Sequence, residues 1–573
     1  MSNVLTIGKS ALNAAQVGIA TVGHNIANAA TPGYSRQVVV QAAAQAQNFG
    51  YGFVGQGANV VGIQRVYNET LAKQVINATA TAKASSAYYS NISQINNLLS
   101  DSTAGLNPVI TSFFSAVSAA AANPSDTATR QTFMSSAQSM INRFNSVNNQ
   151  LQDMRNSINT QITASVDTIN SYASQISILN DTINKALNST GNPPNDLMDQ
   201  RDQLVAKISE QIQTTIIKQD DGSYNVFAGS GMPLVVGTTQ YSLYTRASDT
   251  DLGRLEVAYG NPASPKILSN ETLTGGTLGG VLKFRTDTLD VVQNQIGQLA
   301  LTLTSQFNAQ QTQGLDLNGI AGTNLFNTIQ PQVSPSSRNP STSPLITASF
   351  DKTSLVTSSD YSVRYTSGRY VITRLSDNAQ MPEPDPDPLA IPWDGTLPVT
   401  FNGITIGPGT GTPAEGDYYM VQPTRAAASN LSLNFTDVSK LALADATGGP
   451  GNNVNGLLLA KLQTGYFVDG GNTLTQGTVR LGGSDANPVY GTYSRSFSQM
   501  VSAVGTKTNE LSITSLADAT ALENATNAMQ SESGVNLDEE ATDLLRYQQA
   551  YQAAGKMMQI ASQLFEVLLQ MGQ

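Results

Sequence analysis

Residues 537–571 read LDEEATDLLRYQQAYQAAGKMMQIASQLFEVLLQM, and the apolar residues of this stretch repeat every seven positions. The first position of each heptad holds a large apolar side chain, at Leu537, Leu544, Tyr551, Met558 and Phe565. The fourth positions are filled by Tyr547, Ala554, Ala561 and Leu568. This repeat predicts an amphipathic helix about 50 Å long with a coiled-coil seam. Asn536 precedes the helix as a candidate N-cap, with Glu539 as its capping-box partner.

The beginning of the chain carries a matching apolar stripe. Its large residues again stand seven apart, at Leu5, Leu12, Ile19 and Ile26. The fourth positions of these heptads are smaller: Gly8, Ala15, Val22 and Ala29. A partner helix can therefore approach this seam closely. Pro32-Gly33 is a turn signal that ends the predicted helix near Ala30, and residues 38–40 are expected to be extended.

We interpret the two stripes as surfaces through which subunits assemble. Periodicity alone fits equally well a monomeric antiparallel pair of helices that closes the chain. The low charge beside the stripes favours packing on several sides, because a solvated helix usually carries many Lys and Glu residues. Residues 1–68 hold no acidic residue, whereas residues 531–573 hold six acids and two bases. The two ends are therefore complementary in charge.

The interior predicts a helical rod with β insertions. Apolar spacing from Phe133 to Ile183 indicates a helix of about 60 residues, roughly 90 Å long, between Asn123-Pro124 and Pro193-Pro194. Shorter helices are predicted at about 84–99, 109–122, 196–213, 280–311 and 494–530. Residues 214–275 and 330–450 show short alternating runs and turn signals, which indicate inserted β domains.

Composition excludes most kinds of chemistry. The 573 residues include no Cys and one His, His24, so thiol catalysis, disulfides and thiolate metal sites are absent. The net charge of −11 argues against nucleic acid and anionic membrane surfaces as partners. No apolar run approaches the ~20 residues that span a bilayer, and the N-terminus lacks the pattern of a cleavable signal peptide. We expect no enzymatic activity, no cofactor and no metal.

Several motifs point to a family. Residues 25–37 (NIANAATPGYSRQ) and 533–569 resemble the terminal signatures of the flagellar rod, hook and hook-associated axial proteins. Interior motifs resemble the hook-associated protein 1 family of hook–filament junction proteins: LMDQRDQL (197–204), GGTLGGVLKFR (275–285), GLDLNGIAGTNLF (314–326) and GDYYMVQPT (416–424). The resemblance covers nearly the whole chain and is weakest in about 330–400.

The resemblance implies a ring of copies on the distal end of the hook, with terminal helices that form an inner coiled-coil tube. The implied partners are further copies, the hook protein, the second junction protein, the type III export apparatus, and an export chaperone that holds the C-terminal helix, including its stripe to Leu568. The implied location is the extracellular flagellum. We expect a helix-end motif to set where the chain leaves the tube: Asn25, Asn28, Pro32, Gly33, Tyr34 and Arg36.

The expected fold is therefore α+β and multidomain, with discontinuous helical domains and inserted all-β domains. The predicted domains are 1–45 with 535–573 (terminal coiled coil), 46–213 with 276–329 and 451–534 (helical rod), 214–275 (small β insertion) and 330–450 (outer β domain). Two alternatives stay open at this point: a distal rod or hook protein, and a secreted adhesin that binds glycans through β insertions near Trp393.

Overall fold

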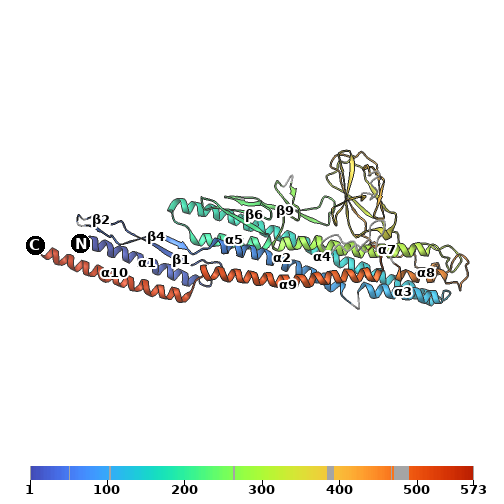
Figure 1. The fold of residues 1–573 in the computed structure, drawn as a ribbon, viewed down its shortest axis with the longest axis horizontal. Helices are drawn as coiled ribbons and strands as arrows, with labels where there is room; N and C mark the ends of the chain where they lie inside the picture. The colour runs from blue at the N-terminus through green and yellow to red at the C-terminus, as the bar shows by residue number, and fades with distance from the viewer. Residues whose placement is uncertain are drawn as a thin grey trace.

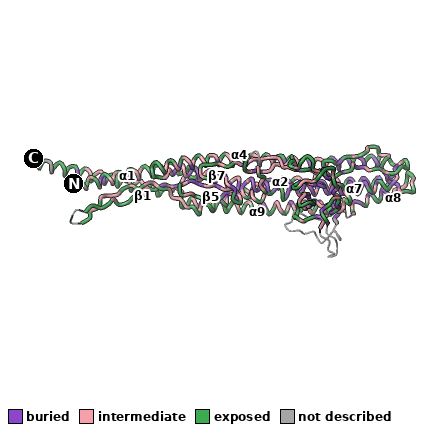
Figure 2. Tube along the Cα trace, turned by 90° about the horizontal axis from the view of Figure 1, so that it is seen from above, coloured by how far each residue is buried: buried purple, intermediate pink, exposed green. Residues whose placement is uncertain are grey.

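The chain forms a long rod with both termini at the same end (Figure 1). The computed structural model describes residues 2–48, 50, 52–101, 105–261, 265–383, 393–465, 467–469 and 490–571. Helices run along the whole length of the rod, and sheets lie on one side of it (Figure 1). Figure 2 shows buried residues along the interior of the rod, whereas the terminal helices carry mostly exposed and half-buried residues.

The terminal end consists of two antiparallel helices and a β arm. Helix α1 (Ser2–Asn28) packs on α10 (Leu537–Met571), so both predicted terminal helices are confirmed. After α1 the chain turns and forms β1 (Gln37–Ala43), which pairs antiparallel with β4 (Ala58–Arg65). The short strands β2 (Gln47–Asn48) and β3 (Phe53–Val54) continue this arm toward the end of the rod where the chain termini lie (Figure 1).

The rod is a bundle of helices that come from distant parts of the sequence. Its members are α2 (Glu69–Leu99), α3 (Leu106–Ala122), α4 (Thr127–Thr190), α5 (Asn195–Gln211), α6 (Gly276–Phe284), α7 (Asp290–Gln311), α8 (Val454–Lys461) and α9 (Tyr493–Ser533). A π-helical turn, Arg285–Leu289, joins α6 to α7. Helix α2 packs mainly on α9 and α6, which brings the N-terminal and C-terminal parts of the rod together.

Helix α4 confirms the predicted long helix. Its 64 residues begin after Asp126, whose carboxylate accepts hydrogen bonds from two backbone amides of the first turn. It ends at Gly191, which adopts a left-handed φ of +68°, a conformation that costs glycine no steric strain. The apolar stripe from Phe133 to Ile183 is buried along the rod, because α3, α5, α7 and the small sheets cover it.

Two predicted helices were too short. Helix α2 begins at Glu69 rather than near residue 84, and α6 begins at Gly276 rather than near residue 280. The early part of α2 buries Ile76 among the small or polar residues Ala72, Thr79 and Ala80, so one large buried side chain leaves only a weak apolar stripe. In α6, Gly280 lies against the backbone of Ala84, so the helix is held by close packing rather than by its propensity.

The β insertions form two regions. In the first, β5 (Thr214–Lys218), β6 (Tyr224–Ala228), β7 (Met232–Val236) and β8 (Thr239–Gln240) make a four-stranded sheet, and β9 (Leu243–Ala247), β10 (Leu255–Tyr259) and β11 (Lys266–Ile267) make a three-stranded one. Both sheets share the hydrophobic core of the rod. A small strand pair, β20 (Val468–Asp469) and β21 (Tyr490–Gly491), precedes α9.

The second region has its own core and stands out from the side of the rod (Figure 1). Its larger sheet has the order β12 (Gln332–Pro335), β19 (Tyr418–Gln422), β14 (Tyr361–Thr366), β15 (Arg369–Arg374) and β16 (Ala379–Met381). The smaller sheet has the order β13 (Thr347–Phe350), β18 (Ile404–Gly407) and β17 (Val399–Phe401). Helices from the two ends of the chain pack together, and the sheets are inserted between them in sequence, which confirms the predicted α+β class.

Candidate functional site

The terminal helix pair packs through small residues. A Cβ added at Gly8 would lie 2.8 Å from Met558 Sδ, and one added at Gly18 would lie 2.5 Å from the Tyr547 ring. On α10, Ala554 and Ala561 are buried at 2% and 3% exposure. The fourth positions of the heptads therefore hold the two helices together, at a distance that larger side chains would prevent.

The large residues of the predicted stripes are mostly not buried by this pairing. On α1, Leu5, Leu12 and Ile19 are half-buried, and Ile26 is exposed. On α10, Leu544 and Met558 are half-buried beside α1. The other described members of the stripe are 45–55% exposed: Leu537, Tyr551 and Phe565. The side chain of Leu568 lies outside the described residues.

A second apolar stripe runs along the opposite side of α10. Its members are spaced by three and four residues and are 37–73% exposed: Met557, Ile560, Leu564, Val567 and Met571. Leu545 is also exposed, at 59%. The prediction from heptads starting at Leu537 missed these residues, although the same spacing rule applied from Met557 finds them. Helix α10 is thus apolar on two sides, and α1 covers only one.

The helix-end motif is brought together around Asn25. This side chain is 1% exposed. Its Nδ2 donates to the backbone oxygen of Gln37 and to Glu540 Oε2, both at 2.9 Å. Its Oδ1 accepts from Gln37 N (3.0 Å) and from the Tyr34 hydroxyl (2.8 Å). Burial and nearby carboxylates raise the pKa of Tyr34, so its hydroxyl stays protonated. Asn25 therefore ties α1, β1 and α10 to one another.

Arg36 makes the second link between the two ends of the chain. Its Nε donates to Glu540 Oε1 at 2.7 Å, and its other nitrogens lie 3.0 Å from Glu539 and 3.5 Å from Asp543. The Glu540 side chain is only 1% exposed. Burial would lower the pKa of Arg36, but the hydrogen bond and charge of Glu540 outweigh it and raise the pKa.

The predicted capping box at the start of α10 is half correct. Asn536 Oδ1 accepts a hydrogen bond from the backbone amide of Asp538 at 3.0 Å, as an N-cap should. Glu539 does not complete the box; its carboxylate pairs with Arg36. The ion pair wins because Arg36 offers a charged donor, whereas the box offers a neutral backbone amide.

Helix α5 connects this joint to the rod. The Asp199 carboxylate accepts from Ser35 N at 2.9 Å and from Ser35 Oγ at 2.8 Å. Arg65, at the end of β4, donates to Asp199 Oδ1 at 2.7 Å and to Asp202 Oδ2 at 2.6 Å. Sequence reasoning used residues 197–204 only for the resemblance and missed this role. The sequence did contain a signal for it. Arg36 and Arg65 lie in a segment without acidic residues, so any carboxylate that pairs with them must come from a distant part of the chain.

The turn after α1 lies against the same helix. Asn28 Nδ2 donates to the backbone oxygen of His24 at 3.0 Å. Gly33 adopts a left-handed φ of +73°, and Gln203 of α5 donates to the backbone oxygen of Pro32. All six residues of the predicted helix-end motif thus lie at one joint between the terminal pair and the rod. We call this the terminal joint and define it by residues 25–37, 65, 199–203 and 539–543.

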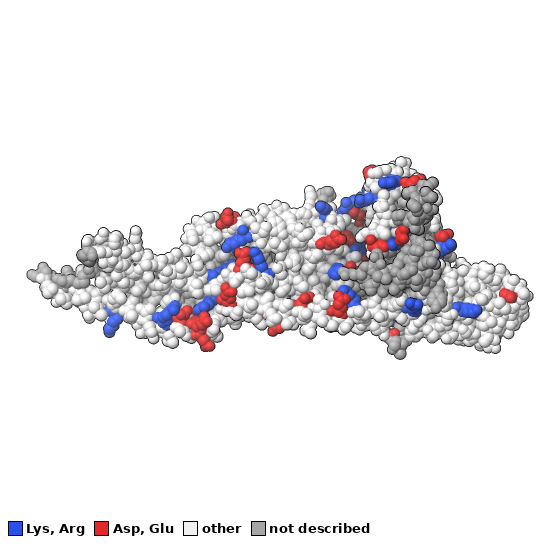
Figure 3. All heavy atoms as spheres, viewed as in Figure 1, with Lys and Arg blue, Asp and Glu red and all other residues white. Residues whose placement is uncertain are grey.

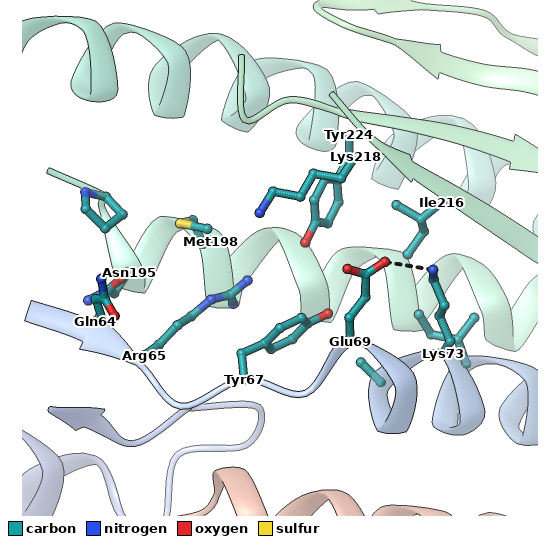
Figure 4. Close-up of a pocket in the computed structure, with 13 residues that line it drawn as sticks. Gln64, Arg65, Tyr67, Glu69, Lys73, Asn195, Met198, Ile216, Lys218 and Tyr224 are labelled. Carbon is teal, nitrogen blue, oxygen red and sulfur yellow. Dashed lines mark ion pairs between the residues drawn. The ribbon is translucent and has the colours of Figure 1, made fainter. Parts of the chain in front are cut away.

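Two hollows border the terminal joint. A groove of about 590 Å³ lies between the turn at 29–35, α2, α5 and the connection from α9 to α10. A smaller cavity of about 270 Å³ lies between the end of β4, α2, α5 and the first small sheet. Figure 4 shows Arg65, Tyr67 and Glu69 pointing from the β4–α2 connection toward Lys218 and Tyr224 of the sheet. Glu69 pairs with Lys73 at 2.7 Å (Figure 4), and the other charged residues of the lining, Arg65 and Lys218, are basic.

Charge on the terminal pair is concentrated where α10 begins. Figure 3 shows acidic side chains gathered where α10 begins and an almost uncharged surface beyond them. The exposed acids there include Glu532, Asp538 and Glu539. Farther along the pair, Lys9 and Lys556 are exposed and form no ion pair among the described residues.

A buried charge cluster fixes the outer β region to the rod. Asp290, the first residue of α7, accepts from Arg155 of α4 and from Arg254 beside β10, each at 2.6 Å. Arg425, which follows β19, lies 3.8 Å from Asp290 and 2.5 Å from Asp360. Because these residues come from five separate segments, the cluster sets how the outer region sits on the helices.

Among the described residues, no group of three His, Cys, Asp or Glu residues is placed to hold a metal ion. None of the helices drawn from these residues is both long and apolar enough to cross a bilayer. The arrangement is that of a scaffold whose exposed apolar surface is concentrated on its terminal helices.

Comparison with family models agrees with this arrangement along most of the chain. Residues 92–326 match "Flagellar hook-associated protein FlgK helical domain" and residues 334–423 match "Flagellar hook-associated protein 1, D2-like domain". The termini match broader models: residues 5–34 "Flagella basal body rod protein" and residues 526–571 "Flagellar basal body rod FlgEFG protein C-terminal". The termini are thus shared with rod proteins, and the interior is specific.

Comparison with full-length relatives distinguishes a rod protein from a hook-associated protein. The chain is 33% identical over 572 residues to flagellar hook-associated protein 1 of Escherichia coli (strain K12), covering 99% of this chain and 100% of that protein. Identity to the protein of the same name from Salmonella typhimurium (strain LT2) is 33% over 578 residues, with 99% and 100% covered. The flagellar hook junction protein FlgK from Burkholderia pseudomallei superimposes with a TM-score of 0.69 at 26% identity, covering 80% of this chain and 100% of that one. The chain belongs to the flagellar hook-associated protein 1 family, whose members are non-enzymatic structural proteins of the extracellular hook–filament junction.

Proposed function

We propose that copies of this chain form a ring between hook and filament and that they contact one another through the terminal helix pair. The main support for this proposal is that α1 and α10 pair through small residues and leave large apolar side chains exposed. An isolated soluble protein rarely leaves so regular an apolar stripe uncovered. Packing of neighbouring helices against both sides of α10 would bury it.

The hook protein and the second junction protein are the proposed neighbours below and above the ring. Support comes from the termini, which match models of rod proteins rather than models specific to this family. Ends shared across axial proteins suit contacts between different members. We propose that the chain leaves the cell through the type III export apparatus, with a chaperone covering α10 beforehand. The exposed stripe of α10 is the surface that such a chaperone would shield.

Within one copy, the terminal joint would set the angle between tube and rod. Its hydrogen bonds join segments that are up to 515 residues apart in sequence. We propose four domains with the boundaries expected from the sequence: 1–45 with 535–573, 46–213 with 276–329 and 451–534, 214–275, and 330–450. The separate core of the outer β sheets supports the last of these.

Deletion of the gene, followed by complementation with wild-type or variant genes, tests the ring proposal. Cells that lack the gene should carry hooks without filaments and release flagellin into the medium, as seen by electron microscopy and immunoblotting. The wild-type gene should restore filaments, whereas Leu564→Asp should not, because it places a charge in the proposed interface. Ile178→Asp, on α4, changes an equally exposed apolar residue outside the terminal pair and should restore filaments. Normal filaments with Leu564→Asp would contradict the proposal.

A further inference from the structure

The β arm carries an apolar side chain that nothing in its own chain covers. Residues 37–64, which form the arm, include no Asp, Glu, Lys, Arg or His. Near the tip, Phe53 is 77% exposed, and the exposed residues around it are small, at Ala42, Ala43 and Ala46. A ribbon of two strands is marginally stable in water unless something packs on it. The outer side of the arm therefore suits an apolar partner.

The arm and α10 lie on different sides of α1 (Figure 1). Helix α1 contacts β1 and β4 of the arm as well as α10. The second apolar stripe of α10, from Met557 to Met571, is left uncovered. One copy thus presents two exposed apolar surfaces, the tip of the arm and the stripe, on different sides of its terminal end.

The stripe can be placed by its height above the terminal joint. Height is counted along the terminal pair from the contact between Asn25 and Glu540. Since a helix rises about 1.5 Å per residue, Met557 lies at about 26 Å and Leu564 at about 36 Å. The stripe therefore belongs to the half of the terminal pair that is farther from the rod.

The tip of the arm lies at the same heights. Gly57 lies against Ser10 of α1, and Ser10 is 15 residues before Asn25, at a height of about 23 Å. Phe53 is four residues farther out along an extended chain, which places it at about 36 Å. The exposed alanines of the tip lie between these two heights, because Ala43 pairs with the neighbour of Gly57. Phe53 thus matches Leu564 in height, and the alanines match Met557.

We infer that the tip of the β arm of one copy packs on the second apolar stripe of α10 in the next copy around the ring. Phe53 then contacts Leu564, and Met557 fits against the small residues of the arm. The contact rests on the proposed ring assembly and adds the surfaces through which neighbouring copies meet.

The other exposed sides of the terminal pair fit the stripe less well. The exposed side of α1 carries Lys9, Asn13, Gln16 and Ala20, and the polar side of α10 carries Gln548, Gln552, Gln559 and Gln563. Packing either side on the stripe would bury polar groups without partners. The tip of the arm brings a large apolar side chain and no charge, so the desolvation cost is smaller.

Equal height is the reason for choosing a second copy. The arm and the stripe are different surfaces, so each copy gives its arm to one neighbour and receives an arm from the other. Such a head-to-tail contact repeats, and it can close into a ring because it adds no shift along the axis. Two stripes packed on each other would instead form an isologous pair, which ends at a dimer.

Thiol cross-linking tests the contact directly, because the chain contains no Cys. A short bifunctional thiol reagent joins two cysteines only when their side chains lie close together. We expect Phe53→Cys/Leu564→Cys to give a ladder of cross-linked oligomers in flagella with attached filaments. Val61→Cys/Leu564→Cys is the matched control. Val61 lies on the same arm at a height of about 10 Å, so this pair should stay monomeric.

Mixed chains show whether the contact joins two copies. Cells that make the Phe53→Cys chain and the Leu564→Cys chain together should give cross-linked dimers, because each contact uses one arm and one α10. Either chain alone should stay monomeric. A product from Leu564→Cys alone would show that stripes pack on each other.

Charge placed at the tip of the arm gives a second measurement. Phe53→Asp should lower the fraction of hooks with filaments about tenfold, because the carboxylate would be desolvated against the stripe. Adding Leu564→Lys should restore part of that fraction, since opposite charges would then meet. Leu252→Asp changes an apolar residue that is 82% exposed outside the terminal end and should have no effect. Circular dichroism of the purified variants checks that the helices are intact.

The outcomes separate the contact from the function. The contact would be overturned, with the ring proposal left standing, by any of three results: no 53–564 product in flagella whose filaments are attached, a product from Leu564→Cys alone, or a full set of filaments with Phe53→Asp. Cross-links from position 53 to the hook protein instead of a second copy would also overturn the inference. Absence of the wild-type chain from hook ends would overturn both proposals.

Discussion

Asp290→Asn removes one charge from the centre of the cluster that holds the outer β region. The substitution keeps the shape of the side chain, so it leaves no cavity. It neutralises the acceptor of Arg155 and Arg254, both at 2.6 Å, while the Arg155 side chain is 3% exposed. Arg155 keeps only Gln293 as an acceptor, and Arg254 keeps Glu256.

The expected loss follows from these contacts. Hydrogen bonds to charged groups contribute about 1.5–3 kcal/mol each, and removing one partner of a buried pair costs about 3–5 kcal/mol. Because each arginine keeps one other acceptor, we expect a loss of about 3–4 kcal/mol. For a large domain, that lowers the melting temperature by roughly 6–16 °C. Far-UV circular dichroism follows the helices, and fluorescence of Trp393, the single tryptophan, follows the outer region.

Asp287→Asn is the matched control. Asp287 lies three residues earlier and pairs with Lys283 at 2.6 Å, but both side chains are at least 42% exposed. An exposed pair of this kind contributes about 0.5 kcal/mol or less, so the control should melt within about 1–2 °C of wild type. If Asp290→Asn shifts the melting temperature no more than Asp287→Asn does, the cluster does not stabilise the fold and the reasoning is wrong.

Two further predictions concern pH and backbone packing. Burial alone would raise the pKa of Asp290, but the nearby arginines lower it overall; its stabilisation should be complete above about pH 5 and lost as the pH falls below about 4. Thermal melts of wild type and Asp290→Asn across this range should converge toward acid, and a constant gap would refute the assignment. Gly280→Ala would place a Cβ 2.3 Å from the backbone oxygen of Ala84, so we expect a net loss of about 1–2 kcal/mol after the gain in helix propensity. Gly505→Ala, with its nearest atom at 3.5 Å, should be neutral or stabilising in the same melts.

The helices with large apolar stripes were predictable from sequence. The spacing of Phe133 to Ile183 fixed the length of α4, and the heptads of residues 537–571 fixed α10, because burial of large side chains imposes the helical period. The beginning of α2 was not predictable in this way. Its early turns bury Ile76 between Ala72 and Ala80, and one large buried side chain among small residues gives little periodic signal.

The terminal joint could be predicted only in part. Residues 25–37 indicated the end of a helix. The lack of acidic residues in 1–68 indicated that the basic residues of this segment pair with acids from distant parts of the chain. Which carboxylates those are depends on the fold: Asp199 approaches Ser35 only because α5 lies beside the turn. The buried Glu540 is likewise indistinguishable by sequence from its exposed neighbour Glu539.

The contact between Asn25 and Glu540 joins residues separated by 515 positions, and this has a consequence for the order of folding. Closing so long a loop is slow compared with forming local helices, and no part of α1 meets its helical partner until the last residues are present. The rod core can be completed before that moment, once α9 (Tyr493–Ser533) has packed on α2. The terminal pair is therefore the last element to be completed. A chain truncated between α9 and α10 would hold a finished rod and an unpaired first helix.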